Sequence, residues 1–348
     1  MKTYGVALIG CGQMGAAHME RIYYKENVRI EYVCDLDIEK AELFKRKFNA
    51  NKTTTDFDEC INDTNVDIVI IAVYPSLHLT ILEKCLAKKK HVICEKPIAT
   101  NHTEGEQFVN AVKTHPDSKV LIGHILRHNK TYQKAAKLIQ SGTIGRPIVM
   151  RMVQNHHTMN RERYLALLSE TSPIIDCGVH YMDIMQWFTG EKITDIHGIG
   201  ARVDDDVPND RYNYGMVTAK LSGGSIGYYE AGWTNTLSAT DTKEFVGPLG
   251  RLKIIYAKDR TANSEEGDLI ELYRYPEKTY EAINVPCDRK PCGDQFDYLI
   301  KMIETGIPPI PSIDEIQESF HAVLQADKAI RESMNMRCDA KIKVDTKR

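Results

Sequence analysis

The sequence of 348 residues lacks three features that would each point to a particular class of protein. No apolar run approaches 18 residues, so we expect no helix that spans a bilayer. A strong excess of one charge is missing, since the formal net charge is −3, and nothing therefore favours nucleic acid or an anionic membrane as a partner. Internal repeats and low-complexity tracts are absent as well. The hydrophobic content of 42% and charged content of 27% are ordinary for a soluble globular protein.

Paired cysteines are also lacking. The nine cysteines are odd in number and scattered, which predicts free thiols in a reducing compartment, the cytoplasm. Cys287 and Cys292 are the closest two, and no second pair stands at zinc-ligand spacing, so we expect no metal site. The N-terminal segment loosely imitates a signal peptide, but glycines interrupt its apolar run, and we expect it to belong to the folded protein.

The length exceeds what one hydrophobic core usually supports, so two domains are expected. We place a dinucleotide-binding domain at residues 1–123. A second domain, expected to bind substrate and to mediate oligomerisation, follows at 124–348.

A glycine motif stands near the start of the chain. The apolar run "YGVALI" (4–9) is followed by "GCGQMG" (10–15) and by a segment typical of a helix. G-x-G-x-x-G between a strand and a helix is the arrangement that binds a dinucleotide pyrophosphate at the helix N-terminus. Gly10 allows a tight turn, Gly12 lets the backbone approach the phosphates, and Gly15 lets helix and strand pack closely.

Asp35 ends the second expected strand, 20 residues after Gly15, close to the spacing of the acid that binds an adenosine ribose. Its carboxylate would accept hydrogen bonds from both ribose hydroxyls and repel a 2′-phosphate. Leu36 follows, where an NADP enzyme often has arginine. We therefore predict NAD over NADP. The alternative is that Asp35 only caps the next helix.

Strands and helices alternate through the first third of the chain, which predicts a doubly wound parallel sheet. Ligands of such sheets bind beyond the carboxyl ends of the strands. Tyr74 and Pro75 lie just beyond one strand end, and Glu95 and Lys96 lie beyond the strand at 91–94. Lys96 is followed by a proline, whose fixed φ stiffens the backbone at this point. We therefore expect the amine of Lys96 at the edge where a nicotinamide would lie. The alternative is a surface lysine.

Short alternating runs between about 193 and 285 predict a large, mostly antiparallel sheet in the second domain. Such a sheet can lend one face to a partner subunit, so we expect a homo-oligomer, a dimer or tetramer. Two helices, roughly 291–304 and 313–333, close the chain.

A helix interrupts this region at about 173–189. Ser172 fits its N-cap, Pro173 its first position and Gly190 its end. Asp176 and His180 lie one turn apart on one face. In a chain with a dinucleotide site we interpret them as a proton-transfer pair, in which the carboxylate orients the imidazole and raises its basicity.

Taken together, "GCGQMG", "AVYPSLH", "HVICEKPIA" and "DCGVHYMD" resemble the Gfo/Idh/MocA oxidoreductase family, which includes glucose–fructose oxidoreductase and inositol dehydrogenases. The resemblance runs through nearly the whole chain. It implies an active centre of Lys96, Asp176 and His180 and a cis Lys96–Pro97 bond. Two departures are the stretch from Glu170 to Pro173, where relatives often have glycines, and Lys130, where many have proline.

We therefore expect an NAD-dependent dehydrogenase that oxidises a secondary hydroxyl of a sugar, inositol or related polyol. An NAD-bound sensor of the same fold, or an enzyme that uses NAD transiently for elimination, hydrolysis or epimerisation, are the alternatives. The residues expected at the cofactor are Gly10, Gly12, Gln13, Met14, Gly15, Asp35, Tyr74, Pro75, His78, Glu95 and Lys96. Candidate substrate-binding residues, from their place beside strand ends, are Arg127, His156 and His157.

Overall fold

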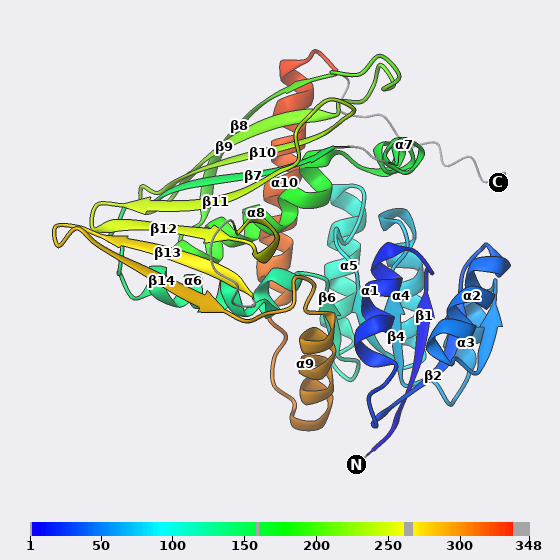
Figure 1. Ribbon diagram of the computed structural model, residues 1–348. Helices are drawn as coiled ribbons and strands as arrows, with labels where there is room; N and C mark the ends of the chain where they lie inside the picture. The colour runs from blue at the N-terminus through cyan, green and yellow to red at the C-terminus, as the bar shows by residue number, and fades with distance from the viewer. Residues whose placement is uncertain (1, 158–159, 261–266, 337–348) are drawn as a thin grey trace. The chain divides into compact units, whose positions relative to one another are not determined.

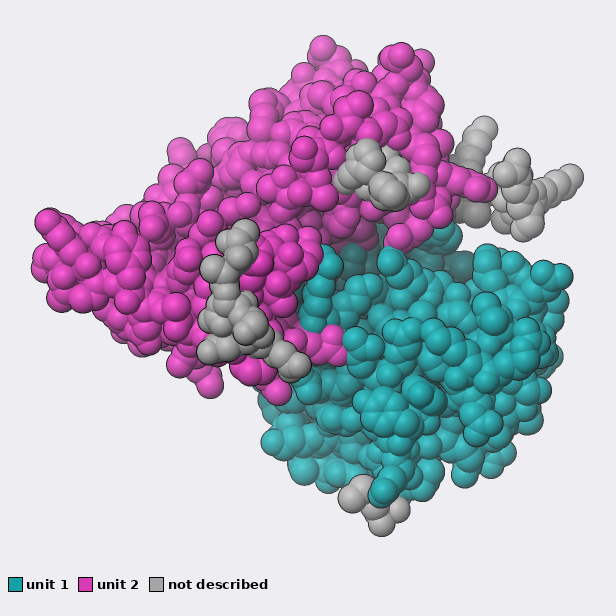
Figure 2. Space-filling model, viewed as in Figure 1, with its two compact units in different colours: residues 1–128, 289–317 teal, residues 129–288, 318–348 magenta. Residues whose placement is uncertain are grey.

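The computed structural model describes residues 2–157, 160–260 and 267–336 and divides the chain into two compact units. The first comprises residues 1–128 and 289–317, and the second comprises residues 129–288 and those from 318 onward (Figure 2). This division differs from the two consecutive segments expected, because the chain returns to the first unit after building most of the second. Among the described residues, no helix is both long and apolar enough to cross a membrane.

The first unit is built on a parallel sheet of six strands in the order β3-β2-β1-β4-β5-β6, which confirms the doubly wound fold (Figure 1). The strands are β1 (Tyr4–Ile9), β2 (Val28–Cys34), β3 (Lys52–Thr54), β4 (Ile68–Ile71), β5 (His91–Cys94) and β6 (Val120–Ile122). Its helices are α1 (Gln13–Ile22), α2 (Ile38–Phe48), α3 (Phe57–Asn62), α4 (His78–Ala87), α5 (His102–Thr114) and α9 (Cys292–Thr305), with 3₁₀ turns η1 (Pro75–Leu77) and η2 (Ile125–His128).

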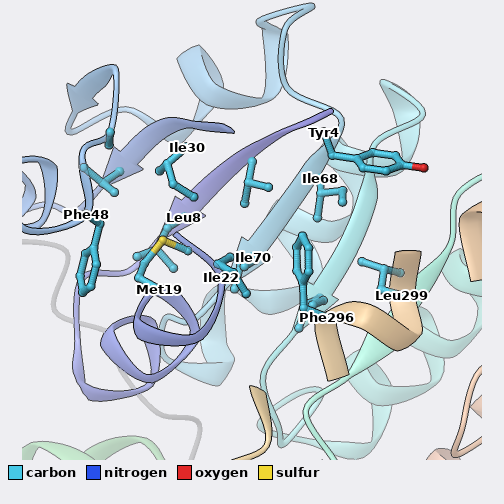
Figure 3. Packing of buried hydrophobic residues seen from close by; sticks show 14 of the residues in the cluster. Tyr4, Leu8, Met19, Ile22, Ile30, Phe48, Ile68, Ile70, Phe296 and Leu299 are labelled. Carbon is cyan, nitrogen blue, oxygen red and sulfur yellow. The ribbon is translucent and has the colours of Figure 1, made fainter. Parts of the chain in front are cut away.

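Helix α9 completes the core of this first unit, although it lies far along the chain. Its Phe296 and Leu299 are fully buried in one apolar cluster with Tyr4, Leu8 and Ile70 (Figure 3). Apolar side chains at three- and four-residue spacing give α9 the stripe that such a surface helix needs. The sequence predicted this helix but placed it in the second domain.

The second unit is built on a sheet of eight strands in the order β14-β13-β12-β11-β7-β10-β9-β8. All neighbours are antiparallel except β7 and β10, which confirms a mostly antiparallel sheet. The strands are β7 (Val149–His157), β8 (Ile193–Ala201), β9 (Tyr214–Leu221), β10 (Ile226–Thr234), β11 (Thr240–Gly247), β12 (Gly250–Ile255), β13 (Asp268–Arg274) and β14 (Thr279–Val285). The helices are α6 (Lys130–Gln140), α7 (Arg161–Glu170), α8 (Pro173–Thr189) and α10 (Ile313–Ser333), whose first turn belongs to the first unit, with the turn η3 (Ala257–Asp259).

Helix α8 packs against this sheet at a point where a side chain in place of Gly178 would be crowded. A Cβ on Gly178 would lie 3.0 Å from the ring of Tyr229 on β10. One turn on, Tyr181 stacks on the same ring with centroids 4.5 Å apart. The ammonium of the buried Lys243, on β11, lies 4.6 Å from the centre of the Tyr181 ring. The helix is therefore fixed on the sheet by close aromatic and cation–π contacts.

Truncation of Phe296 to alanine should destabilise the first unit. The change opens a cavity in a core to which Tyr4 and Ile70 also belong, and buried Phe→Ala changes cost about 3–5 kcal/mol. Urea unfolding followed by circular dichroism should show this loss. Lys301→Ala, at an exposed position of the same helix, is the matched control and should change stability by less than about 0.5 kcal/mol. Equal stability of the two variants would contradict the placement of α9 in this core.

Candidate active site

The glycine loop has the geometry that a pyrophosphate requires. Gly10 has φ +103°, and a Cβ there would lie 2.4 Å from the carbonyl oxygen of Ala72. A Cβ on Gly15 would lie 2.1 Å from the carbonyl oxygen of Gly10, which excludes any side chain where α1 crosses β1. Gly12 is the opposite case, because a Cβ there would meet nothing within 4 Å. The space above Gly12, at the N-terminus of α1, therefore fits a bound phosphate group.

Gln13 and Met14 begin α1 beside this space. Gln13 is exposed and Met14 is half-buried, and the sulfur of Met14 accepts a hydrogen bond from Lys290 at 3.6 Å. No side chain caps the helix, since its N-cap is Gly12, and its first turn contains no acidic residue. The positive end of the helix dipole is thus available to an anionic group.

Asp35 lies at the end of β2 and joins the glycine loop. One carboxylate oxygen accepts a hydrogen bond from the backbone N–H of Cys11 at 2.8 Å, and the other accepts from Asp37 N–H at 3.0 Å. The cap of α2 is Asp37, whose side chain accepts from Glu39 and Lys40 N–H. The alternative that Asp35 merely caps the next helix is therefore wrong. A carboxylate at this place, beside the phosphate-binding loop, fits an acceptor for ribose hydroxyls.

The segment after β4 contains Tyr74, Pro75 and His78. Tyr74 is exposed, and Pro75 is the buried first residue of η1. His78 is fully buried at the start of α4, with Nδ1 2.9 Å from the carbonyl oxygen of Pro97 and Nε2 3.1 Å from that of Val73. Burial lowers the pKa of His78, so the ring is neutral and donates to one of these carbonyl oxygens at a time. From this position we expect His78 to stabilise the loops that contain Val73 and Pro97.

Lys96 follows β5, and the residues on both sides of it are buried. It is the one residue from Val92 to Ala99 that is not buried. The peptide bond between Lys96 and Pro97 is cis, as the resemblance implied. A single charged side chain thus emerges from a buried segment beyond the carboxyl end of a strand, the edge at which ligands of such sheets bind.

The Glu95 side chain points into the protein and is 4% exposed. Its Oε1 lies 2.8 Å from Nε2 of His18, a fully buried residue of α1. A Cβ on Gly123 would lie 2.8 Å from the other oxygen of Glu95, so glycine is needed there to admit the carboxylate. Sequence reasoning placed Glu95 at the cofactor and missed His18. The available signal was a histidine on the apolar face of α1, three residues after Gly15.

Arg127, in η2, is buried in the first unit. Its Nη2 donates to Oε1 of Glu315 at 3.0 Å, which gives the guanidinium a structural partner 188 residues along the chain. The assignment of Arg127 to substrate remains a prediction. His156 of β7 is half-buried near Tyr164, with ring centroids 6.3 Å apart. The side chain of His157 lies outside what the structure describes.

In the second unit, α8 presents Asp176 and His180 on one partly exposed strip. From Thr171 to Met185, only Asp176, Cys177 and His180 are not buried. The Cys177 thiol donates to an oxygen of Asp176 at 3.5 Å, a contact that the sequence analysis did not anticipate. One turn of helix separates the carboxylate from the imidazole, the spacing expected of a carboxylate–histidine pair.

The start of α8 is held by a buried polar network. Ser172 is the N-cap, as predicted, and accepts from Ile175 N–H at 3.1 Å. Its hydroxyl also donates to Asp327 of α10 at 2.7 Å. Tyr212 donates to the same carboxylate at 2.5 Å, and Arg331 donates to its second oxygen at 2.5 Å. The chain therefore has a tightly bonded helix cap at the place where the family resemblance implies glycines.

The other departure from the family pattern, Lys130, is compatible with the same local helix structure. Lys130 is exposed at the first position of α6, after the N-cap Asn129. That first position is the one at which proline is readily accepted, because its backbone N–H has no partner within the helix. Replacement of a proline by lysine there leaves the helix start unchanged.

Comparison with known proteins agrees with this geometry. A family described as "Oxidoreductase family, NAD-binding Rossmann fold" matches residues 4–124, and the GFO/IDH/MocA C-terminal domain matches residues 132–253. A myo-inositol 2-dehydrogenase from Thermotoga maritima is 22% identical over 338 residues, which cover 96% of this chain and 98% of that protein.

Solved structures show the same fold. A myo-inositol 2-dehydrogenase from Lactobacillus plantarum aligns with a TM-score of 0.79 at 20% identity, covering 96% of this chain and 98% of that one. An aldose-aldose oxidoreductase from Caulobacter crescentus aligns with a TM-score of 0.81 at 20% identity, covering 95% and 98%. Both halves of the chain thus match the family, and the chain belongs to the GFO/IDH/MocA family of oxidoreductases.

Proposed function

We propose that this protein is an NAD-dependent dehydrogenase that oxidises a secondary hydroxyl of a sugar, inositol or related polyol. The observation that carries the proposal is Lys96, a single partly exposed amine on a buried mount at the carboxyl edge of a dinucleotide-binding sheet. The inositol dehydrogenases among the relatives support the class of substrate.

The chain's residues fit NAD. The backbone around Gly12 and the N-terminus of α1 would hold the pyrophosphate, and Asp35 would accept hydrogen bonds from the adenosine ribose. Leu36, 82% exposed, stands where a positive side chain would be needed for a 2′-phosphate. Bound NAD supplies the hydride acceptor.

In the proposed reaction, His180 takes the proton of the substrate hydroxyl as general base. Asp176, one turn away, orients the imidazole and stabilises its protonated form. Lys96 donates a hydrogen bond to the reacting oxygen and stabilises the negative charge that develops on it. The buried residues around Lys96 fix the backbone that carries its side chain, which lowers the cost of reorganisation.

We further propose a homo-oligomer that forms through the open face of the second sheet. Exposed Val149, Ile226 and Ile199 lie on one face of strands β7, β10 and β8. Apolar side chains on a solvated sheet face are typical of a subunit contact. The free cysteines of the described chain fit the proposed reducing location, the cytoplasm.

A panel of sugars, inositols and sugar acids, assayed for NADH formation, tests the function directly. Turnover of a polyol with NADH release supports a dehydrogenase. A change in nucleotide fluorescence without turnover would indicate a sensor. Substrate consumption without net NADH would indicate transient use of the cofactor.

Asp35→Ser should narrow the preference for NAD over NADP. The change removes a charged acceptor for the ribose diol and the repulsion of a 2′-phosphate, worth about 1–3 kcal/mol. Dissociation constants of both cofactors measure this. Asp37→Ala is the matched control, since it removes the side-chain cap of α2 and should leave the cofactor preference unchanged. Tighter binding of NADP by the unmodified protein would overturn the assignment.

Oxidation should lose activity at low pH, because only the neutral imidazole of His180 accepts a proton. Asp176→Asn removes a negative charge one turn away and so weakens proton binding by the ring. The acid limb of the kcat/KM profile should therefore move to lower pH, and the plateau should fall. A limb that stays in place would remove Asp176 from the proposed pair.

Lys96→Met keeps the apolar stem and deletes the charge. It should lower kcat by about 10²–10³, the usual cost of losing one preorganised donor to a developing oxyanion, while NAD binding stays nearly unchanged. Steady-state kinetics with the identified polyol and a cofactor titration measure the two effects. Lys88→Met, at the exposed N-terminal side of β5, should behave as the unmodified protein. Near-normal turnover by Lys96→Met would show that Lys96 is a surface lysine without a role in the reaction.

A further inference from the structure

The residues on both sides of Lys96 are held by buried histidines from different helices. Before it, Glu95 is bonded to His18 of α1 at 2.8 Å. After it, the carbonyl oxygen of Pro97 lies 2.9 Å from Nδ1 of His78, at the start of α4. Both histidines are fully buried. The backbone that carries the amine is therefore fixed from two directions, one of them through the helix that begins at the glycine loop.

The bond between His18 and Glu95 joins two ionisable groups at 2.8 Å. Burial by itself would lower the pKa of His18, but its interactions with Cys292 of α9 and with Glu95 outweigh burial and raise the pKa to about 10. Burial likewise opposes ionisation of Glu95, yet its bond to His18 and the nearby charge of Lys96 lower its pKa. Both shifts favour the imidazolium–carboxylate form of the pair.

Glu95 thus has two cationic neighbours, His18 and the adjacent Lys96. A buried carboxylate that loses its partner is strongly destabilised and recruits the nearest donor or proton. Without His18, the cationic neighbour that remains is Lys96, one residue along the chain. An amine drawn toward Glu95 would be displaced from a reacting oxygen, and a displacement of about 1 Å can cost about 10²-fold in rate.

We infer that His18 is a positioning residue for Lys96: by neutralising Glu95 it keeps the lysine amine available to the substrate oxygen. The inference rests on the proposed role of Lys96 and deepens it. It assigns the glycine-motif helix a second task, since Gly12 caps the start of α1 and His18 lies six residues later on the same helix. The helix that follows the glycine loop is thereby linked, through His18 and Glu95, to the residue next to Lys96.

The test is a double-mutant rescue. His18→Phe keeps a ring of similar shape and removes the positive charge, and it should lower kcat about 10- to 100-fold with little change in NAD affinity. Adding Glu95→Gln to that variant removes the competing carboxylate and should restore kcat at least several-fold. Glu95→Gln alone should lose less than His18→Phe, because its amide oxygen still accepts from His18. A His18 role in packing alone predicts no rescue.

Lys90→Met is the matched control for burial. Lys90 stands at the other end of β5, is 8% exposed and donates to the carbonyl oxygens of Asp63 and Val66 at 2.8 and 2.6 Å. Its loss should lower stability and leave kcat unchanged. An equal fall of kcat in Lys90→Met and His18→Phe would overturn the inference, because destabilisation would then explain both.

Acetylation of Lys96 by an N-hydroxysuccinimide ester, quantified by peptide mass spectrometry, gives a readout independent of turnover. Labelling should slow several-fold in His18→Phe and recover in the double variant. If the unmodified protein turns over no polyol, the proposed function is wrong. The labelling rates of Lys96 still test the inference in that case, because they do not depend on turnover. Unchanged labelling in His18→Phe would overturn the inference alone. Should His18→Phe fail to fold, His18→Gln, which keeps a donor without charge, is expected to change in the same direction.

The pH dependence of stability supplies a second independent readout. Because the pKa of His18 is raised from 6.5 to about 10, its contribution to stability is complete below about pH 6.5 and is lost as the pH rises toward 10. The stability gap between the unmodified protein and His18→Phe should therefore shrink steadily over that range in urea unfolding. A gap that does not change with pH would show that His18 is neutral and would overturn the inference.

Discussion

Close backbone packing around Gly10 is the constraint on which the ligand-facing edge of the first unit depends. The carbonyl of Gly10 touches the place where Gly15 would carry a side chain, and Gly10 itself lies against Ala72 beyond β4. These contacts fix β1, α1 and β4 against one another at distances that no Cβ allows. The same packing turns the N-terminus of α1, with Gly12 at its cap, toward open space. The close crossing of the backbone at Gly10 and Gly15 therefore determines the position of the α1 N-terminus, where we expect the phosphate groups to bind.

Both units present their candidate reactive groups in the same physical way. In the first, Lys96 is the partly exposed residue of an otherwise buried segment. In the second, Asp176, Cys177 and His180 form the partly exposed strip of a helix that packs on the sheet through Gly178 and Tyr181. A reactive group on a buried mount loses little entropy when it meets its substrate, which is the physical basis of preorganisation.

The region before Asp176 departs from the glycines that the family resemblance implies. Ser172, at the start of α8, donates to Asp327 of α10, and Tyr212 and Arg331 donate to the same carboxylate. Because this network lies directly before the partly exposed strip, it alters the surroundings of Asp176 rather than the pair itself. A substrate cannot therefore be transferred from the inositol dehydrogenases by similarity alone, and the substrate panel has to decide it.

The sequence by itself determined the features that depend on residues close together along the chain. The glycine motif, the cap of α8 by Ser172, its end at Gly190 and the alternation of strands and helices all follow local rules, and the structure has each of them. Tertiary structure decided what depends on distant residues. His18 meets Glu95 across 77 residues, Arg127 meets Glu315 across 188, and α9 returns to the core of the first unit. No local pattern encodes such pairs, because burial and partner are set only when the helices and strands pack together.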